Sequence, residues 1–117
     1  MYQAKILVVD DEVYILHILD FILGAESYDV VTATNGEQAL QKVREEKPDL
    51  VILDIMMPKL DGYETCRMIK NDPTTKGIPV ILLTAKGREV GANDYMTKPF
   101  SPSKLIERVQ AILGVRR

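Results

Sequence analysis

The sequence has a single cysteine, Cys66, so no disulfide can form within the chain. A lone thiol is typical of proteins in reducing compartments, and we therefore expect a cytoplasmic protein. No apolar run approaches the ~20 residues that span a bilayer. The first residues also lack the charged-then-apolar layout of a secretion signal. The sequence thus predicts neither a membrane span nor secretion.

The sequence also lacks an excess of basic over acidic residues. The 117 residues include 15 lysines and arginines against 17 acidic residues, which gives a net charge of -2. Nucleic-acid-binding domains usually carry a basic surface, so we expect no direct contact with nucleic acid. The phosphate-binding patterns G-x-x-x-x-G-K-[ST] and G-x-G-x-x-G do not occur, which argues against nucleotide and flavin binding.

What the chain does contain is an alternation of strand and helix patterns, which predicts an α/β fold with a parallel sheet. A length of 117 residues with 46% hydrophobic content suits one domain over residues 1–117. Three of the predicted strands are almost wholly apolar, as central strands buried on both faces are. The five predicted strands are Lys5–Val9, Asp29–Ala33, Leu50–Leu53, Val80–Leu83 and Asp94–Thr97.

Helix start and stop signals lie between these strands. The last helix has Ser101 as its N-cap, Pro102 at its first position and Gly114 just past its end. Two further helices follow capping-box patterns that open at an asparagine and an aspartate. The other three predicted helices are Glu12–Leu23, ending at Gly24, then Gly36–Lys47 after Asn35, and Gly62–Asn71 after Asp61.

Charged residues stand where the predicted strands end. Asp10 and Asp11 follow the first strand, Asp54 the third, and Lys98 the fifth. The carboxyl ends of parallel strands meet at one edge of a sheet, where open α/β folds bind their ligands. Carboxylates placed so close together repel each other unless a cation lies between them. An oxygen-only site of this kind suits Mg²⁺.

Four short motifs therefore occur in a fixed order along the chain. They are Asp10-Asp11, Asp54 followed by Ile55–Gly62, Thr84-Ala85, and Lys98-Pro99-Phe100. In this combination the chain resembles the receiver domain of bacterial two-component response regulators over nearly its whole length. The resemblance implies a flavodoxin-like, doubly wound, five-stranded parallel sheet with strand order 2-1-3-4-5.

The resemblance also implies a phosphoacceptor and a metal site. Asp54 corresponds to the carboxylate that takes a phosphoryl group from a phosphohistidine on a sensor histidine kinase or phosphotransfer protein. Asp10 and Asp11 correspond to the Mg²⁺-binding pair. Asp54 and the main-chain carbonyl of Met56 complete the protein ligands. Such a domain is a switch in a signalling pathway and not an enzyme, although its own residues promote phosphotransfer and later dephosphorylation.

Three further residues correspond to groups that bind the phosphoryl oxygens. These are the Lys98 ammonium, the Thr84 hydroxyl and the backbone N–H of Ala85. Tyr95 stands where the family carries an aromatic side chain that moves inward when the threonine engages phosphate. The alternative for Tyr95 is a half-exposed tyrosine on an edge strand.

Other interpretations stay open for single residues. Asp11 is equally compatible with capping the first helix. The only histidine, His17, is expected at the surface and Cys66 in the core. A rival function is a phosphotransferase or phosphatase of the haloacid-dehalogenase type, which needs an aspartate where Met56 stands. Another is a receiver-derived interaction module with impaired switching.

The chain departs from the family between the fourth and fifth strands. Only residues 85–93 connect them, whereas a parallel crossover normally takes about a dozen residues or more. We therefore expect the helix between these strands to be absent or shortened to at most one turn. This predicts exposed apolar side chains at Ile81, Leu83 and Met96, and a homodimer that covers them.

Overall fold

A computed structural model describes residues 3–57, 60–84, 92–97 and 100–114. It contains one five-stranded sheet in which every neighbouring pair is parallel, with the order β2-β1-β3-β4-β5. The predicted α/β class and strand order are confirmed. The strands are β1 (Lys5–Val9), β2 (Asp29–Ala33), β3 (Leu50–Asp54), β4 (Val80–Thr84) and β5 (Asp94–Thr97).

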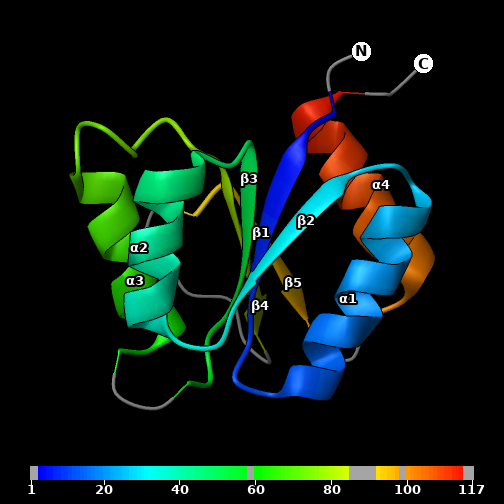
Figure 1. Cartoon of the computed structure of the whole chain (residues 1–117), viewed down its shortest axis with the longest axis horizontal. Helices are drawn as coiled ribbons and strands as arrows, with labels where there is room; N and C mark the ends of the chain where they lie inside the picture. The colour runs from blue at the N-terminus through cyan, green and yellow to red at the C-terminus, as the bar shows by residue number, and fades with distance from the viewer. Residues whose placement is uncertain (1–2, 58–59, 85–91, 98–99, 115–117) are drawn as a thin grey trace.

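Helices cover both faces of the sheet. Figure 1 shows α1 and α4 on one face and α2 and α3 on the other. Within the described ranges, none of the helices has both the length and the apolar character that crossing a bilayer demands. The helices are α1 (Val13–Ala25), α2 (Gly36–Glu46), α3 (Gly62–Asn71) and α4 (Pro102–Leu113).

The central strands divide the core into two layers because successive side chains point to opposite faces. Ile6 and Val8 of β1 pack with residues of α1 and α4. Leu7 and Val9 pack with residues of α2 and α3, including the buried Cys66. The near-continuous apolar runs of the sequence are thus explained by burial on both faces.

The predicted caps of three helices are confirmed. Asn35 and Asp61 accept hydrogen bonds from the N–H groups of residues 38 and 64, at 2.8 and 2.9 Å. Ser101 accepts one from Lys104 N–H at 3.2 Å. These bonds satisfy donors that have no partner within the helix.

Two predicted helix ends are wrong by one or two residues. α1 continues through Gly24 to Ala25, and the left-handed position that follows it is taken by Ser27 with a φ of 68°. α2 ends at Glu46, because Lys47 adopts a left-handed φ of 46°. A helix stops where the backbone turns left-handed, and here residues other than glycine accept that conformation.

The predicted exposure of apolar residues on β4 and β5 is also wrong. Ile81 and Leu83 are fully buried and Met96 is 6% exposed. All three belong to the core layer covered by α1 and α4, which a shortened connection does not uncover. The predicted form of the connection itself lies outside the described residues, since the description stops at Thr84 and resumes at Ala92.

The chain re-enters the sheet after this connection through a reciprocal pair of hydrogen bonds. Asn93 N–H donates to the carbonyl of Val80 at 2.8 Å. Val80 N–H in turn donates to Asn93 Oδ1 at 2.9 Å. Because Val80 begins β4 and Asn93 directly precedes β5, these two bonds align the starts of the two strands.

Candidate functional site

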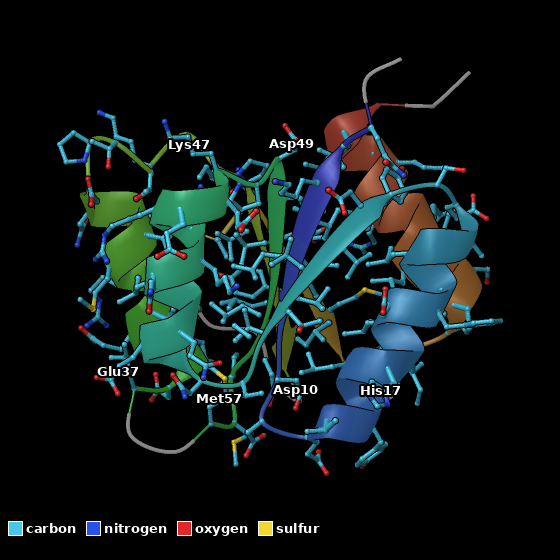
Figure 2. All side chains as sticks on the ribbon, viewed as in Figure 1. Asp10, His17, Glu37, Lys47, Asp49 and Met57 are labelled. Carbon is cyan, nitrogen blue, oxygen red and sulfur yellow. The ribbon has the colours of Figure 1, made fainter. Side chains whose placement is uncertain are left out.

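Three carboxylates gather at the carboxyl ends of β1 and β3. These strands are neighbours, with Val9 opposite Leu53, so the residues that follow them lie side by side. Oxygens of Asp10, Asp11 and Asp54 all lie within 4.8 Å of one another. Figure 2 shows Asp10 at this end of the sheet and Asp49 at the opposite end.

The three carboxylates differ in burial. Asp10 is fully buried and Asp54 is 2% exposed, while Asp11 lies at the surface. Asp10 Oδ1 accepts a hydrogen bond from Glu12 N–H at 2.9 Å, and Asp10 N–H donates to the carbonyl of Ala33 at 3.2 Å. These contacts fix Asp10 between β1 and β2.

Asp11 does not cap the first helix. The N-cap of α1 is Glu12, whose side chain makes no capping hydrogen bond. The alternative that assigned Asp11 to the cap is therefore wrong. The exposed carboxylate of Asp11 instead belongs to the group at the sheet edge.

The backbone of Asp54 is held by a close approach that sequence reasoning missed. A Cβ atom at Gly62 would lie 2.3 Å from the carbonyl oxygen of Asp54 and 2.6 Å from Cα of Ile55. Gly62 N–H donates to the carbonyl of Ile55 at 3.1 Å. Only glycine allows α3 to begin so near the end of β3. The sequence signal for this close approach is a glycine at the first position of a helix, because the capping residue before it does not itself require a glycine there.

A second glycine fixes the start of α2 against α3. A Cβ at Gly36 would lie 2.4 Å from Thr65 Oγ1 and 2.7 Å from the carbonyl oxygen of Leu60. Thr65 is fully buried, and its hydroxyl donates to the carbonyl of Asp61 at 2.8 Å. The loop from Asp54 to α3 is therefore anchored at its far end.

The other predicted site residues are placed to different extents. Thr84 ends β4 opposite Thr97 of β5. Tyr95 is partly buried and packs against the core layer under α2 and α3. Met56 directs an 80% exposed side chain to solvent, whereas Met57 is 7% exposed. Ala85 and Lys98 lie outside the described residues.

The donor set fits a hard divalent cation. Within the part of the chain that the structure describes, the group of Asp10, Asp11 and Asp54 is the one cluster of at least three possible ligating side chains. It offers carboxylate oxygens and neither nitrogen nor sulfur, which is the ligand chemistry that Mg²⁺ prefers. Two of the carboxylates are buried, where repulsion between like charges is weakly screened.

Comparison with known proteins gives the family. The profile of the response regulator receiver domain matches residues 6–110. The transcriptional regulatory protein PhoP of Bacillus subtilis, which controls alkaline phosphatase synthesis, is 50% identical over 119 aligned positions. That alignment covers 95% of this chain and 49% of the relative, so the chain spans about half the length of the curated relatives it matches. The alignment has more positions than the 117 residues of this chain, so it includes positions of the relative that this chain lacks.

Solved receiver domains share the fold. One from a signal transduction histidine kinase of Syntrophus aciditrophicus is 36% identical with a TM-score of 0.90, covering 97% of this chain and 93% of that one. Another, from a sensor histidine kinase of Pseudomonas aeruginosa, is 28% identical with a TM-score of 0.89, covering 97% and 100%. That structure has a magnesium ion coordinated in its active-site cleft. The chain belongs to the family of response regulator receiver domains.

Proposed function

We propose that residues 1–117 act as one receiver domain that accepts a phosphoryl group on Asp54 from a sensor histidine kinase or a phosphotransfer protein. The observation that carries this proposal is the convergence of Asp54 with Asp10 and Asp11 at the ends of neighbouring strands. A buried carboxylate in an acidic cluster is costly for the fold, so its presence here favours a chemical role.

The transfer is a displacement at phosphorus. A carboxylate oxygen of Asp54 forms the new P–O bond while the P–N bond to the donor imidazole breaks. The electron pair of that bond stays on the imidazole nitrogen, which then takes up a proton. A carboxylate is a weak nucleophile, so the step depends on fixed position and on neutralised charge. The close approach of Gly62 to the Asp54 backbone provides the fixed position.

Charge is neutralised by groups that this chain holds in place. We assign the carboxylates of Asp10, Asp11 and Asp54, with the main-chain carbonyl of Met56, as the protein ligands of Mg²⁺. When bound, the ion supplies positive charge to the oxygens of the transferring group. Asp10 is held by its bonds to Glu12 and Ala33, so the ligands need little rearrangement.

The remaining assignments concern the ends of β4 and β5. These strands end side by side, with Thr84 opposite Thr97. We assign the Thr84 hydroxyl, the Ala85 N–H and the Lys98 ammonium to the phosphoryl oxygens, on the basis of the family resemblance. Tyr95 is assigned to the conformational response that follows.

The domain signals and does not turn over a substrate. Hydrolysis of the aspartyl phosphate, promoted by the same residues, returns the resting state. PhoP of Bacillus subtilis is a transcriptional regulator, yet this chain matches only half of it. With a net charge of -2, the domain has no excess of basic charge for phosphates, and we propose that it does not itself contact nucleic acid.

Small-molecule phosphodonors test this proposal without the partner kinase. The purified domain is incubated with acetyl phosphate or phosphoramidate, with Mg²⁺ or with chelator, and the modified residue is located by mass spectrometry. We expect a single Mg²⁺-dependent phosphoryl group on Asp54. A phosphoryl group on another residue, or equal labelling in chelator, would contradict the assignment.

A further inference from the structure

The side chains of Met56 and Met57 lie in opposite environments, although the two residues are neighbours in the chain. Met56 is 80% exposed, whereas Met57 is 7% exposed. Ile55, on the other side of Met56, is also 7% exposed and belongs with Met57 to the core layer under α2 and α3. Figure 2 shows Met57 at the same end of the sheet as Asp10. Two buried side chains therefore anchor the chain on either side of Met56.

The backbone between these anchors forms a tight turn. Met57 N–H donates to the carbonyl of Ile55 at 3.0 Å, which encloses Met56 in a turn of three residues. The same carbonyl accepts a second hydrogen bond, from Gly62 N–H at 3.1 Å. Because both bonds end on one oxygen, the turn after β3 and the start of α3 are joined at Ile55.

Ile55 also ties this turn to the neighbouring strand. Its N–H donates to the carbonyl of Leu83 in β4 at 3.2 Å. Leu83 is in turn the partner of Asp54 in the strand pairing. Both main-chain groups of Ile55 are thus bonded, and the turn around Met56 begins from a residue that the sheet holds in place.

A main-chain carbonyl differs from a carboxylate as a metal ligand. A carboxylate rotates about its side-chain bonds to meet an ion, whereas a carbonyl moves only with the backbone. Of the ligands assigned above, the three aspartates can adjust in this way and the carbonyl of Met56 cannot. Mg²⁺ demands near-ideal octahedral geometry, so its affinity depends on how well the backbone at Met56 is held.

We propose that Met57 is a positioning residue for Mg²⁺, because its buried side chain holds the turn that presents the carbonyl of Met56. This inference rests on the proposed metal site and adds a residue that is not one of its ligands. Met57 acts through the backbone and not by contact with the ion. Groups that orient metal ligands typically change metal affinity about 10- to 100-fold when they are replaced.

The two methionines therefore have different roles. The carbonyl of Met56 is present whatever side chain stands at that position, so its exposed thioether is dispensable for the metal. The thioether of Met57 fills space in the core, and its truncation leaves a cavity into which the turn relaxes. A turn that holds the carbonyl in place for only a fraction of the time lowers the apparent affinity by that fraction.

Titration of the purified domain with Mg²⁺, followed by amide NMR shifts, tests this role. We expect Met57→Ala to raise the dissociation constant of Mg²⁺ about tenfold. Met57→Leu, which nearly conserves volume, should restore it to near the parental value. Met56→Ala should bind Mg²⁺ like the parent. Met96→Ala is the matched control, since Met96 is 6% exposed in the opposite core layer.

Melting temperatures in chelator separate positioning from a general loss of stability. Met57→Ala and Met96→Ala should both melt below the parent, because each loses a buried side chain, yet only Met57→Ala should lose affinity for Mg²⁺. Ile55→Val removes one methylene group from the other anchor. It should weaken Mg²⁺ binding in the same direction, and it supplies a milder variant if Met57→Ala does not fold.

The outcomes distinguish the positioning role from the metal site itself. A parent that binds Mg²⁺ while Met57→Ala binds it equally well would overturn the role of Met57 and leave the site intact. Equal losses of affinity in Met57→Ala and Met96→Ala would assign the effect to stability and also overturn it. A parent that binds no Mg²⁺ would overturn the metal site and the positioning role together.

Discussion

Gly62 lies so close to Asp54 that a Cβ atom at position 62 would stand 2.3 Å from the carbonyl oxygen of Asp54. This contact joins the first residue of α3 to the last residue of β3. It lets the chain leave the sheet and start a helix while the Asp54 side chain stays at the sheet edge. The position of the proposed acceptor therefore depends on the absence of a side chain eight residues later.

Gly62→Ala should displace the end of β3, because neither the added methyl group nor the backbone it meets is flexible. We expect a loss of roughly 1–3 kcal/mol in the free energy of unfolding. Labelling of Asp54 by acetyl phosphate should fall as well. Gly77→Ala is the matched control, because a Cβ there meets nothing within 4 Å. Equal stability of the two variants would show that the backbone adapts freely.

Mg²⁺ should stabilise the domain in proportion to its occupancy. One bound ion at a hundredfold excess over its dissociation constant contributes about 2.7 kcal/mol, seen as a rising melting temperature. Asp11→Asn should melt higher than the parent in chelator, because repulsion from Asp10 and Asp54 is relieved, and should respond less to Mg²⁺. Glu107→Gln, a neutralised acid on α4, controls for net charge. A lower melting temperature of Asp11→Asn in chelator would mean that this carboxylate supports the fold.

Asn93→Ala should loosen the junction between β4 and β5. The substitution leaves the buried N–H of Val80 without its acceptor at Asn93 Oδ1, which costs about 1–3 kcal/mol. Urea denaturation measures the change. Asn71→Ala, at the exposed end of α3, should stay within roughly 0.5 kcal/mol of the parent. An unchanged midpoint for Asn93→Ala would show that the junction does not need this bond.

The pair formed by Lys5 and Glu46 predicts a dependence of stability on pH. Lys5 Nζ donates to Glu46 Oε1 at 2.9 Å, and this bond, with the positive charge of Lys5, lowers the pKa of Glu46. A carboxyl whose pKa is lowered by folding adds stability above its unfolded pKa, and that stability is lost as the pH falls through the folded value.

Unfolding free energies of the parent and Glu46→Gln should therefore differ most near neutral pH. The difference should shrink as the pH falls below the ordinary glutamate pKa. In a Lys5→Met background, the difference in unfolding free energy caused by Glu46→Gln should depend much less on pH. A difference that stays constant between neutral and acid pH in the parent background would assign it to packing and not to charge.

The parallel sheet could be read from the sequence because apolar runs alternate with capped helices, whereas its strand order followed from the resemblance to receiver domains. The acidic cluster followed for the same reason, since parallel strands end at one edge. The end of α1 could not be predicted, because Ser27 and not Gly24 turns left-handed. Nothing in the glycine itself distinguishes a helix stop from a helical position.

The faces of the central strands could not be predicted either. In a strand such as Val80–Thr84, nearly every residue is apolar, so alternation does not tell which side chains meet which helices. The structure places Ile81 under α1 and α4, where it is buried despite the short connection. In the same way the composition of α1 does not separate Leu19, which faces the core, from Phe21, which faces solvent.

The most direct test of the account is the intact mass of the domain after incubation with acetyl phosphate and Mg²⁺, compared between the parent and Asp54→Asn. An amide is neither anionic nor a nucleophile here, so the variant should gain no phosphoryl group. Asp29→Asn, at the opposite end of the sheet, should be labelled like the parent. A phosphoryl group gained by Asp54→Asn at the parental rate would contradict the assignment of Asp54 as the acceptor.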